Sequence, residues 1–417
     1  MSETFAWYLG IDWGATYHDV CLMNAQGQVC ETRRVAHTLE AVHEAVQWTC
    51  AKAGVASEAI AVGIERPDGV LVTTWLEAGF AMFAINPKQL DRFRDRFTVG
   101  GAKDDRRDAR VVADALRTDR RAFHRIHPDD PAVVQLRALC VLRDDLQTQI
   151  GRLTNRLRDQ LARVDAAWLT VCPAADEPWL WAMLAKAPQA DQWRRLGARR
   201  LTTVLRAHRI RRVTAETVLP ALRAPRLAVA AGVPEAVALH IAALVPQLQL
   251  LQAQHSTTTQ HIDHCLERMA AQETAEGQPG ERRDVEILRS LPGVGRMVAA
   301  TMLTEAAGPL AARDYATLRA HAGTAPITKR SGKRLHLVHM RYACKPRLRG
   351  ALYHWARISI QHDPASRAYY DGLRQRGHAH ARALRSVADR WLRILVAMLK
   401  SQSMYDPSRF TTAAAAA

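Results

Sequence analysis

A repeat of apolar residues at helical spacing is the feature that most constrains how this chain of 417 residues folds. Between residues 131 and 165, apolar side chains recur at intervals of three and four, about 3.5 residues apart on average. The repeat consists of Leu136, Leu139, Leu142, Leu146, Ile150, Leu153, Leu157, Leu161 and Val164. A long helix with such a stripe must cover it with another helix, so the segment predicts a coiled coil.

A second repeat, with more polar members, offers a partner for the first. It consists of Leu248, Leu251, His255, Thr258, Ile262, Cys265 and Met269. The polar positions weaken packing but help to fix the register, and Pro246 is expected to kink this helix or to begin it. We therefore predict an α-helical coiled-coil middle domain, residues 123–280, in which the repeats form an antiparallel hairpin or a dimer contact.

The residues before the first repeat alternate between strand and helix patterns. Strands are expected over residues 7–14, in a hairpin over 18–36, and over 59–65 and 81–87. Helices are expected over 38–54 and 69–79, and from Lys88 to about Arg117. Strands first, followed by alternating strands and helices, predict an α/β domain around a mixed sheet, residues 1–122.

Acidic residues in this region fall where strand ends and a crossing helix can meet. Asp12 and Glu65 each end a predicted strand, and Asp105 and Asp108 lie three residues apart, on one face of a helix. Carboxylates from these elements would bind a hard cation such as Mg²⁺, or alternatively Mn²⁺, and a pair of ions stabilises both oxygens in phosphoryl transfer. Alone, Asp12 is more often a solvated cap, Glu65 before Pro67 can simply mark a turn, and the segment with Asp105 and Asp108 is more often a charged helix face. On spacing, Asp104 competes equally with Asp105.

The charge of the chain indicates the class of its partner. Lys and Arg number 58 against 41 Asp and Glu, a formal net charge of +17, and such a surface attracts polyanions such as nucleic acid. The segment DWGAT resembles the first phosphate loop of sugar kinases and actin-like ATPases. Those proteins need a second phosphate loop and an adenosine loop that this sequence lacks, and the charge is unusual for a small-molecule kinase.

Cysteine usage and hydropathy indicate the compartment. The seven cysteines are scattered and include no CxxC pair, which favours reduced thiols. The N-terminal segment has no basic stretch followed by a long apolar one, and no uninterrupted apolar run reaches the roughly 18 residues of a membrane span. We expect a cytoplasmic protein with no membrane partner.

After a linker at residues 274–284, a mostly α-helical C-terminal domain is predicted over residues 281–410. Residues 288–307 contain Leu-Pro-Gly-Val-Gly before a helix, which is the helix-hairpin-helix pattern. Gly293 and Gly295 would let backbone N–H groups at the helix start approach a DNA phosphate. The alternative is a tight turn that only packs.

A basic segment further along surrounds one serine. Ser331 is flanked by Lys329, Arg330, Lys333 and Arg334. A serine hydroxyl alone is a poor nucleophile, but dense positive charge would fix a phosphodiester beside it and stabilise the developing charge. The segment is in any case a candidate nucleic-acid contact.

Other residues in this half have weaker claims to chemistry. His336 and His339 are possible proton carriers, although lone histidines are more often ordinary surface or strand residues. Tyr369 and Tyr370 are rival nucleophiles, but the Arg/His/Arg/Tyr set of tyrosine recombinases cannot be assembled around them. His261, His264 and Cys265 lie on one side of a predicted helix and could suggest a zinc site. Because the sequence offers no second pair of ligands, we favour a coiled-coil face.

The motifs together resemble one family. The segments GIDWG, GIERP, AKDDRRDARVVADAL, LPGVG and GTAPITKRSGK occur in this order, and the whole looks like the DEDD transposases of bacterial insertion sequences, related to the pilin-gene invertases. The resemblance implies a RuvC-like, RNase H-like N-terminal domain, a coiled-coil middle and a C-terminal serine domain. Its Lys-x-Asp-x-x-Asp-Ala motif falls on Lys103, Asp105 and Asp108, which favours Asp105 over Asp104.

The resemblance also implies a mechanism. The family's remaining metal ligands fall on Asp12 and Glu65, and its nucleophile falls on Ser331, which implies a covalent phosphoserine link to DNA. Such a link conserves the energy of the phosphodiester, so no nucleotide cofactor is implied. A homo-oligomer, dimer or tetramer, with carboxylates and serine from different protomers, is implied as well. So is a structured guide ("bridge") RNA.

The sequence thus predicts a Mg²⁺-dependent DNA transposase or site-specific recombinase. Two alternatives remain open. One is a RuvC-like structure-selective nuclease that uses metal-activated water and needs no Ser331. The other is a non-catalytic, basic nucleic-acid-binding scaffold in which the acids are solvated caps.

Overall fold

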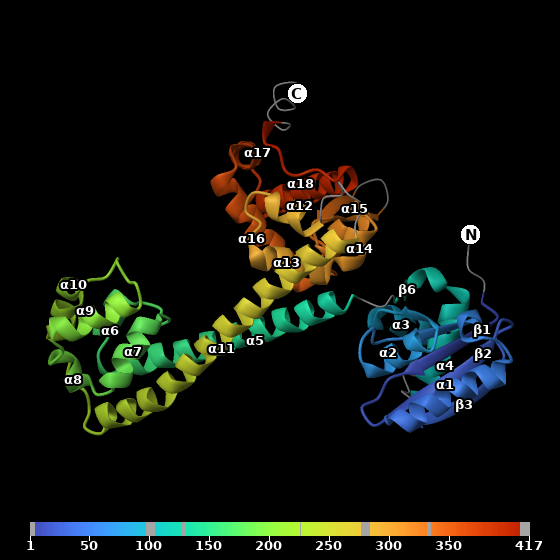
Figure 1. The fold of residues 1–417 in the computed structure, drawn as a ribbon, viewed down its shortest axis with the longest axis horizontal. Coiled ribbons are helices and arrows are strands. Elements are labelled where there is room, and N and C mark those ends of the chain that lie inside the picture. Colours follow the sequence, from blue (N-terminus) through green and yellow to red (C-terminus); the bar gives the residue numbers. More distant parts are fainter. Residues whose placement is uncertain are drawn as a thin grey trace. The chain divides into compact units, whose positions relative to one another are not determined.

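A computed structural model describes residues 5–96, 105–126, 130–225, 227–276, 284–331 and 335–408. The chain divides into two compact units, residues 1–129 and residues 130–417. Each is described by itself, with the elements labelled as in Figure 1.

The first unit is built on a mixed six-stranded sheet. The strand order is β3-β2-β1-β4-β5-β6, in which β1, β4 and β5 are parallel and the other pairings are antiparallel. The strands are β1 (Trp7–Asp12), β2 (Tyr17–Asn24), β3 (Val29–Ala36), β4 (Ile60–Ile64), β5 (Ala81–Ala84) and β6 (His124–Arg125). The predicted mixed α/β domain is confirmed, and it is consistent with an RNase H-like fold.

Helices cover both faces of this sheet. Helices α1 (Leu39–Ala53) and α2 (Val70–Glu77) pack on one face, against Leu9 and Ile11 of β1. Helices α3 (Pro87–Arg94) and α4 (Asp105–Thr118) pack on the other, against Ala61 and Phe83. The alternation of side chains along each strand explains the two cores. The expected single helix from Lys88 to about Arg117 is wrong, because α3 ends at Arg94 and a turn follows at residues 95 and 96.

Two long helices organise the second unit. Helix α5 (Pro131–Val164) and helix α11 (Val233–Glu276) pack along each other in antiparallel fashion. The predicted helices are present, but α11 does not begin at Pro246, which lies inside it. Leu142, a member of the predicted repeat, is 48% exposed. The coiled-coil geometry itself stays a prediction.

Each end of the helix pair enters a separate core. The C-terminal half of α5 and the N-terminal half of α11 pack with five short helices, around a cluster that includes Trp168, Trp179 and Trp193. These helices are α6 (Ala167–Val171), α7 (Pro178–Lys186), α8 (Ala190–Arg194), α9 (Ala198–Ala207) and α10 (Ala215–Arg223). Packing within one chain thus explains most apolar residues of the repeats, with the exposed Leu142 as an exception.

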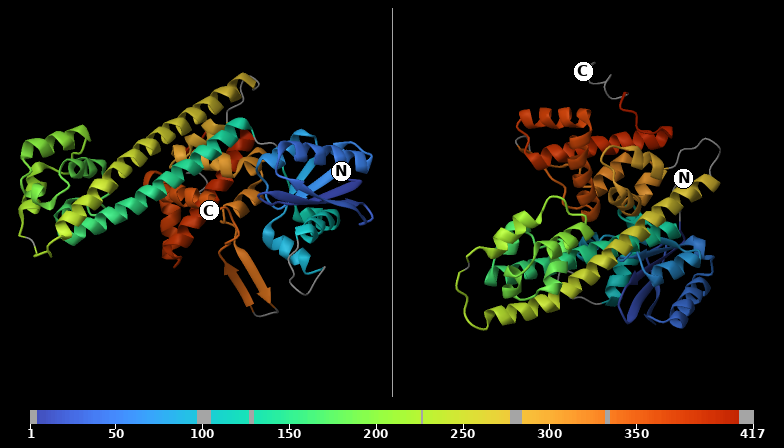
Figure 2. Two further views of the ribbon diagram at one scale, coloured as in Figure 1. Left: turned by 90° about the horizontal axis from the view of Figure 1, so that it is seen from below. Right: turned by 60° about the vertical axis from the view of Figure 1, so that its left-hand side comes forward.

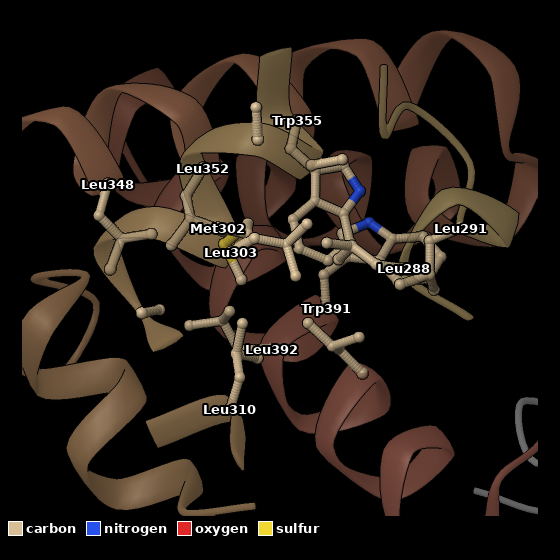
Figure 3. Close-up of a cluster of buried hydrophobic side chains, with 14 of the residues drawn as sticks. Leu288, Leu291, Met302, Leu303, Leu310, Leu348, Leu352, Trp355, Trp391 and Leu392 are labelled. Carbon is tan, nitrogen blue, oxygen red and sulfur yellow. The ribbon is translucent and has the colours of Figure 1, made fainter. Parts of the chain in front are cut away.

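The other end of the pair enters a C-terminal helical core. Trp355 and Trp391 stack with ring centroids 5.8 Å apart, among the leucines that Figure 3 shows. Leu136 from α5 and Ile262 from α11 belong to the same core. Its helices are α12 (Asp284–Ser290), α13 (Arg296–Glu305), α14 (Ala307–Ala311), α15 (Tyr315–His321), α16 (Pro346–His362), α17 (Pro364–Gln375) and α18 (His380–Ser401). The predicted helical C-terminal part is confirmed.

A strand pair interrupts these helices. Strands β7 (Ile327–Ser331) and β8 (Leu335–His339) pair antiparallel, with Ile327 opposite His339 and Ser331 opposite Leu335. Figure 2 (left) shows the two strands extending away from the helices around them. Here the expected basic loop is largely strand.

Among the described residues, one segment is long and apolar enough to resemble a membrane span. It covers residues 233–271 of α11. Val237, Ile241, Ile262 and Leu266 on this helix are buried in the two cores of the second unit. Packing within the protein accounts for these four residues.

Candidate metal centre

Two acidic residues leave the sheet at the same edge. Asp12 is the last residue of β1, and Glu65 directly follows β4. The two strands are parallel, and Ile11 lies opposite Ile64. The next residues along the two chains, Asp12 and Glu65, therefore lie side by side. Both acids are half-buried. The backbone register therefore explains why these two carboxylates neighbour each other although they lie far apart in the sequence.

A close approach between helix and strand brings a third acid to this edge. A Cβ atom at Gly10 would lie 2.0 Å from the backbone oxygen of Ala109 and 2.5 Å from the backbone nitrogen of Ala113. Because β1 has no side chain at Gly10, α4 lies directly against it. Asp108, the neighbour of Ala109, is thereby held beside the end of β1.

Asp12, Glu65 and Asp108 line one pocket of about 720 Å³. Asp19, Arg66 and Arg94 also line it. A pocket with several carboxylates offers the oxygen donors that Mg²⁺ and Mn²⁺ prefer, and the arginines favour an anionic substrate next to them. The donor set thus fits a hard divalent cation.

Asp108 is deeply buried and held by an arginine. It is 3% exposed, and its two carboxylate oxygens accept hydrogen bonds of 2.8 and 2.9 Å from Nε and Nη2 of Arg94 on α3. The bidentate pair compensates the charge that burial would otherwise leave isolated. A cation at Asp108 would have to share this carboxylate with Arg94 or displace the guanidinium.

The carboxylates share a pocket without forming a tight cluster. Among the described residues, the only three acidic, histidine or cysteine ligand atoms that lie within 4.8 Å of one another belong to Cys172, Asp176 and Glu177. In the trio Asp12, Glu65 and Asp108, at least one pair of carboxylates is therefore separated by more than 4.8 Å. Separate ligands for two ions, about 3.5–4 Å apart, are compatible with such spacing.

Part of the predicted motif lies outside the described residues. Asp105 is the first residue of α4, one turn before Asp108, but its side chain is not described. Lys103 and its neighbour Asp104 lie outside the described ranges altogether. Their roles stay predictions.

The predicted nucleophile lies in the second unit. Ser331 is the last residue of β7, and Lys329 and Arg330 precede it in the same strand. The structure describes the backbone of these three residues and of His336, but not their side chains, and Lys333 and Arg334 lie outside the described ranges. No distance between Ser331 and the carboxylate pocket follows, because they belong to different units.

The turn of the predicted helix-hairpin-helix packs against its own domain. Gly293 has φ +83°, and a Cβ there would lie 2.9 Å from the backbone nitrogen of Ser359 on α16. Trp355 donates a hydrogen bond from Nε1 to the Pro292 oxygen at 3.0 Å. Gly295, by contrast, is exposed at the start of α13. Packing accounts for Gly293, and a phosphate contact remains a prediction for Gly295.

The sequence comparisons identify a family for these features. Residues 9–165 match a model described as a transposase, of the DEDD type found in IS110, and residues 285–371 match the model for the transposase IS116/IS110/IS902 family. The chain belongs to the IS110/IS116 transposase family. The first match contains the carboxylate pocket, and the second contains Ser331 and the strand pair.

Curated relatives of this IS110/IS116-family chain cover it to different extents. A putative transposase, y4uE, of Sinorhizobium fredii is 42% identical over 209 residues, 50% of this chain and 58% of that protein. The chain thus spans little more than half the length of y4uE. The mini-circle putative transposase for IS117 of Streptomyces coelicolor is 28% identical over 96% of both chains. An uncharacterized 42 kDa protein of insertion element IS900 of Mycobacterium paratuberculosis is 27% identical over 98% of this chain and 99% of its own.

One acid at this IS110/IS116-type pocket was not predicted from the sequence. Asp19 on β2 pairs in register with Asp12, is 4% exposed and lines the same pocket. Arg34 donates hydrogen bonds of 3.2 and 2.8 Å to its two oxygens, and Arg106 of α4 lies 4.0 Å away. The available signal was the hairpin register, which sets the two aspartates opposite each other.

A histidine pair behind the Asp12 loop was also missed. His18, fully buried, accepts a hydrogen bond from the Gly14 N–H at Nδ1 (3.4 Å), and its Nε2 lies 2.8 Å from Nδ1 of His37. Because Nδ1 of the neutral His18 ring accepts the Gly14 hydrogen bond, Nε2 carries the proton and donates a hydrogen bond to Nδ1 of His37. Burial, and secondarily the charge of His37, lowers the pKa of His18. The pair thereby holds the loop that carries Gly14 into the pocket.

The other sequence candidates do not assemble into sites. Cys265 is buried in the C-terminal core while His261 and His264 are exposed, so these three do not converge. Tyr370 bonds His380 at 2.8 Å, from its hydroxyl to Nδ1, which leaves it engaged by a neighbouring helix.

Proposed function

We propose that this chain cleaves and rejoins DNA as the transposase of an insertion sequence, with the carboxylate pocket of the first unit as its metal centre. The observation that carries the proposal is the convergence of Asp12, Glu65 and Asp108 on one pocket, within a segment that matches DEDD transposases. The charge of +17 supports a polyanionic substrate.

In this proposal Asp12, Glu65, Asp105 and Asp108 hold Mg²⁺ or Mn²⁺. When bound, the ion neutralises charge that develops on the phosphate oxygens during strand transfer. The chain's own contribution is positioning. Gly10 lets α4 lie on β1, and Arg94 holds the Asp108 carboxylate at the pocket through two hydrogen bonds. A carboxylate has about four lone-pair sites, so bidentate pairing leaves two available.

Ser331 is proposed as the nucleophile. Its Oγ attacks the phosphorus of the scissile phosphodiester, a bond from Oγ to phosphorus forms, and the bond to one deoxyribose oxygen breaks. The serine loses its proton and the leaving oxygen gains one. Attack by another DNA hydroxyl then reverses the exchange and releases the serine. One ester replaces another at each step, so the reaction requires no nucleotide cofactor.

A denaturing gel of the protein with DNA of the element's ends tests the nucleophile. We expect a covalent protein–DNA adduct with the unmodified chain and none with Ser331→Ala, while both bind DNA equally. Ser401→Ala, a substitution at the exposed end of α18, is the matched control and should form the adduct. An adduct with Ser331→Ala contradicts the assignment. Cleaved ends without protein would instead support the metal-dependent nuclease.

Substitutions at the pocket test the metal centre. Asp108→Asn keeps the shape of the side chain but removes its charge, so we expect cleavage to fall at least about 100-fold. Glu44→Gln removes an exposed charge on α1 in the same unit and should leave cleavage unchanged. Equal cleavage by all three proteins would contradict the assignment of Asp108 to the metal centre, whereas absence of cleavage by the unmodified chain would leave only the non-catalytic scaffold.

Oligomerisation and RNA guidance belong to the same proposal. A dimer or tetramer would let one protomer supply carboxylates and another supply Ser331, and a structured RNA would select the DNA. Mixing Asp108→Asn and Ser331→Ala chains tests the first point, because restored cleavage requires a site shared between protomers. Addition of the RNA transcribed from the element tests the second, and cleavage that is equal without it excludes guidance.

A further inference from the structure

An arginine-rich pocket lies in the second unit and shares no residue with the carboxylate pocket of the first unit. It has a volume of about 540 Å³ and is bounded by α15, α17, α18 and the ends of the strand pair. Six arginines line it, against one carboxylate. They are Arg319, Arg341, Arg382, Arg385, Arg390 and Arg393.

Helix α18 supplies most of this charge on one face. The polar face consists of Arg382, Arg385, Ser386, Asp389, Arg390 and Arg393, at helical intervals of three and one. The opposite face is buried in the C-terminal core through residues such as Leu384, Val387 and Trp391. Core packing therefore fixes the helix and holds its arginines toward the pocket.

The single carboxylate is already fully engaged. Asp389 accepts two hydrogen bonds of 3.0 Å from Arg319, one of 2.8 Å from Thr324 and one of 3.0 Å from Tyr315. It forms an ion pair with Arg319. In the described part of the chain, Arg341, Arg382 and Arg385 form no ion pair.

The pocket also contains polar atoms that lack partners. Nε of Arg341 and Nδ1 of His378 are buried and have no hydrogen-bond partner among the described residues. A buried guanidinium N–H without an acceptor is costly. Burial, followed by the charges of Arg382 and Arg349, lowers the pKa of Arg385. An anion in the pocket would accept a hydrogen bond from the Arg341 guanidinium and relieve the repulsion between the cations.

We infer that this pocket binds a backbone phosphate of nucleic acid. The inference rests on the proposed function for the source of the phosphate. Several guanidinium groups around one cavity suit phosphate oxygens, which arginine binds in bidentate fashion. The small-molecule alternative is disfavoured because the pocket is continuous with a basic strand pair that leads away from it.

The strand pair relates the pocket to the proposed nucleophile. Pro326 and His339 line the pocket, and Ser331 lies four residues beyond Ile327 on β7. At about 3.3 Å per residue, the Ser331 backbone lies about 13 Å along the strand. One DNA strand rises about 3.4 Å per nucleotide, so the pocket would hold a phosphate about four nucleotides from the bond that Ser331 attacks. The pocket would thus set which phosphodiester of the bound DNA lies at Ser331.

Salt-dependent binding of the full chain to a short DNA duplex tests this inference. We compare Arg382→Gln/Arg385→Gln with the matched control Arg289→Gln/Arg357→Gln, which removes two exposed arginines elsewhere in the same helical domain. Loss of the one phosphate contact that the pocket makes should reduce the slope of log K against log salt by about 1. Affinity should fall at low salt in the pocket variant only. If the double variant unfolds, Arg382→Gln alone, at an exposed position, should still reduce the slope, by less than about 1.

The outcomes separate this inference from the proposed function. Equal slopes for the pocket variant and its control overturn the phosphate site, even if the unmodified chain forms the Ser331 adduct. Conversely, a pocket variant with a reduced slope supports the site even if Ser331→Ala still forms the adduct. The same titration with an RNA duplex shows whether the phosphate comes from DNA or RNA. The nucleic acid whose affinity falls in the pocket variant is the one that the pocket binds. Absence of binding to both nucleic acids overturns both proposals.

Discussion

At the scale of single residues, the carboxylate pocket depends on ion pairs that hold its buried acids. Arg94 compensates Asp108, and Arg34 compensates Asp19. These arginines come from neighbouring elements, 14 and 15 positions away in the sequence. A sequence pattern identifies the acids from strand ends and helix spacing, but it does not show which arginine reaches which carboxylate, because that depends on tertiary packing.

Removal of Arg94 should expose the competition between arginine and metal. Arg94→Ala leaves the buried Asp108 charge without its partner, so we expect the free energy of unfolding to fall by about 2 kcal/mol without metal. Mg²⁺ should then raise the melting temperature of the variant more than that of the unmodified chain, because the carboxylate is free to bind it. Thermal unfolding with and without Mg²⁺ measures both effects. An unchanged Mg²⁺ response would show that Asp108 is not a ligand.

The buried histidine gives the first unit a pH-dependent stability. The native pKa of His18 is lowered by burial and by His37, whereas the unfolded chain keeps a value near 6.5. Below about pH 6.5 the unfolded state therefore binds the proton first, and stability falls as the pH falls, by at most about 1.4 kcal/mol per pH unit. His18→Gln keeps an acceptor for Gly14 and should flatten this slope. Urea unfolding at a series of pH values from about 7 to 5 measures it, and parallel slopes would contradict the prediction.

At the scale of elements, the contact between β1 and α4 positions the site. Gly10→Ala would place a Cβ against the backbone of α4, and we expect a loss of about 3 kcal/mol in unfolding free energy, since a backbone atom has little room to move. Gly151→Ala in α5 meets no atom within 4 Å and should raise stability by about 1 kcal/mol through helix propensity. Denaturant titrations compare the two. Equal effects would show that the helix shifts freely on the strand.

The elements also show how far the sequence predicts the structure. Asp12 and Glu65 were assigned to strand ends from hydrophobic patterns alone, and the strands are there. The strand pair β7–β8 was missed because its lysines, arginines and histidines resemble a basic loop. Leu142 keeps the spacing of the repeat but is exposed, because periodicity does not reveal how wide a face the partner covers. The arginines of α18 have helical spacing in the sequence, but they belong to no motif that indicates a binding site.

At the scale of the whole molecule, the C-terminal core depends on helices from the middle of the chain. Leu136 and Cys140 of α5, and Ile262 and Leu266 of α11, are buried in the same cluster as Trp355. Residues 281–410, predicted from the sequence as a domain, would leave the apolar surface opposite these side chains exposed if expressed alone. We therefore expect that fragment to lack a cooperative thermal transition and to aggregate.

Residues 130–408 retain both long helices and both cores, so this longer fragment should unfold cooperatively. Calorimetry of the two fragments under identical conditions makes the comparison, and the unmodified chain provides the reference transition. Each buried leucine or isoleucine contributes about 1.5–3 kcal/mol, which for a few such residues approaches the whole stability of a small domain. A sharp transition for residues 281–410 alone would show that the helix pair is an appendage to the C-terminal core and not part of it. The basic pocket on α18 would then be expected to bind DNA without the rest of the chain.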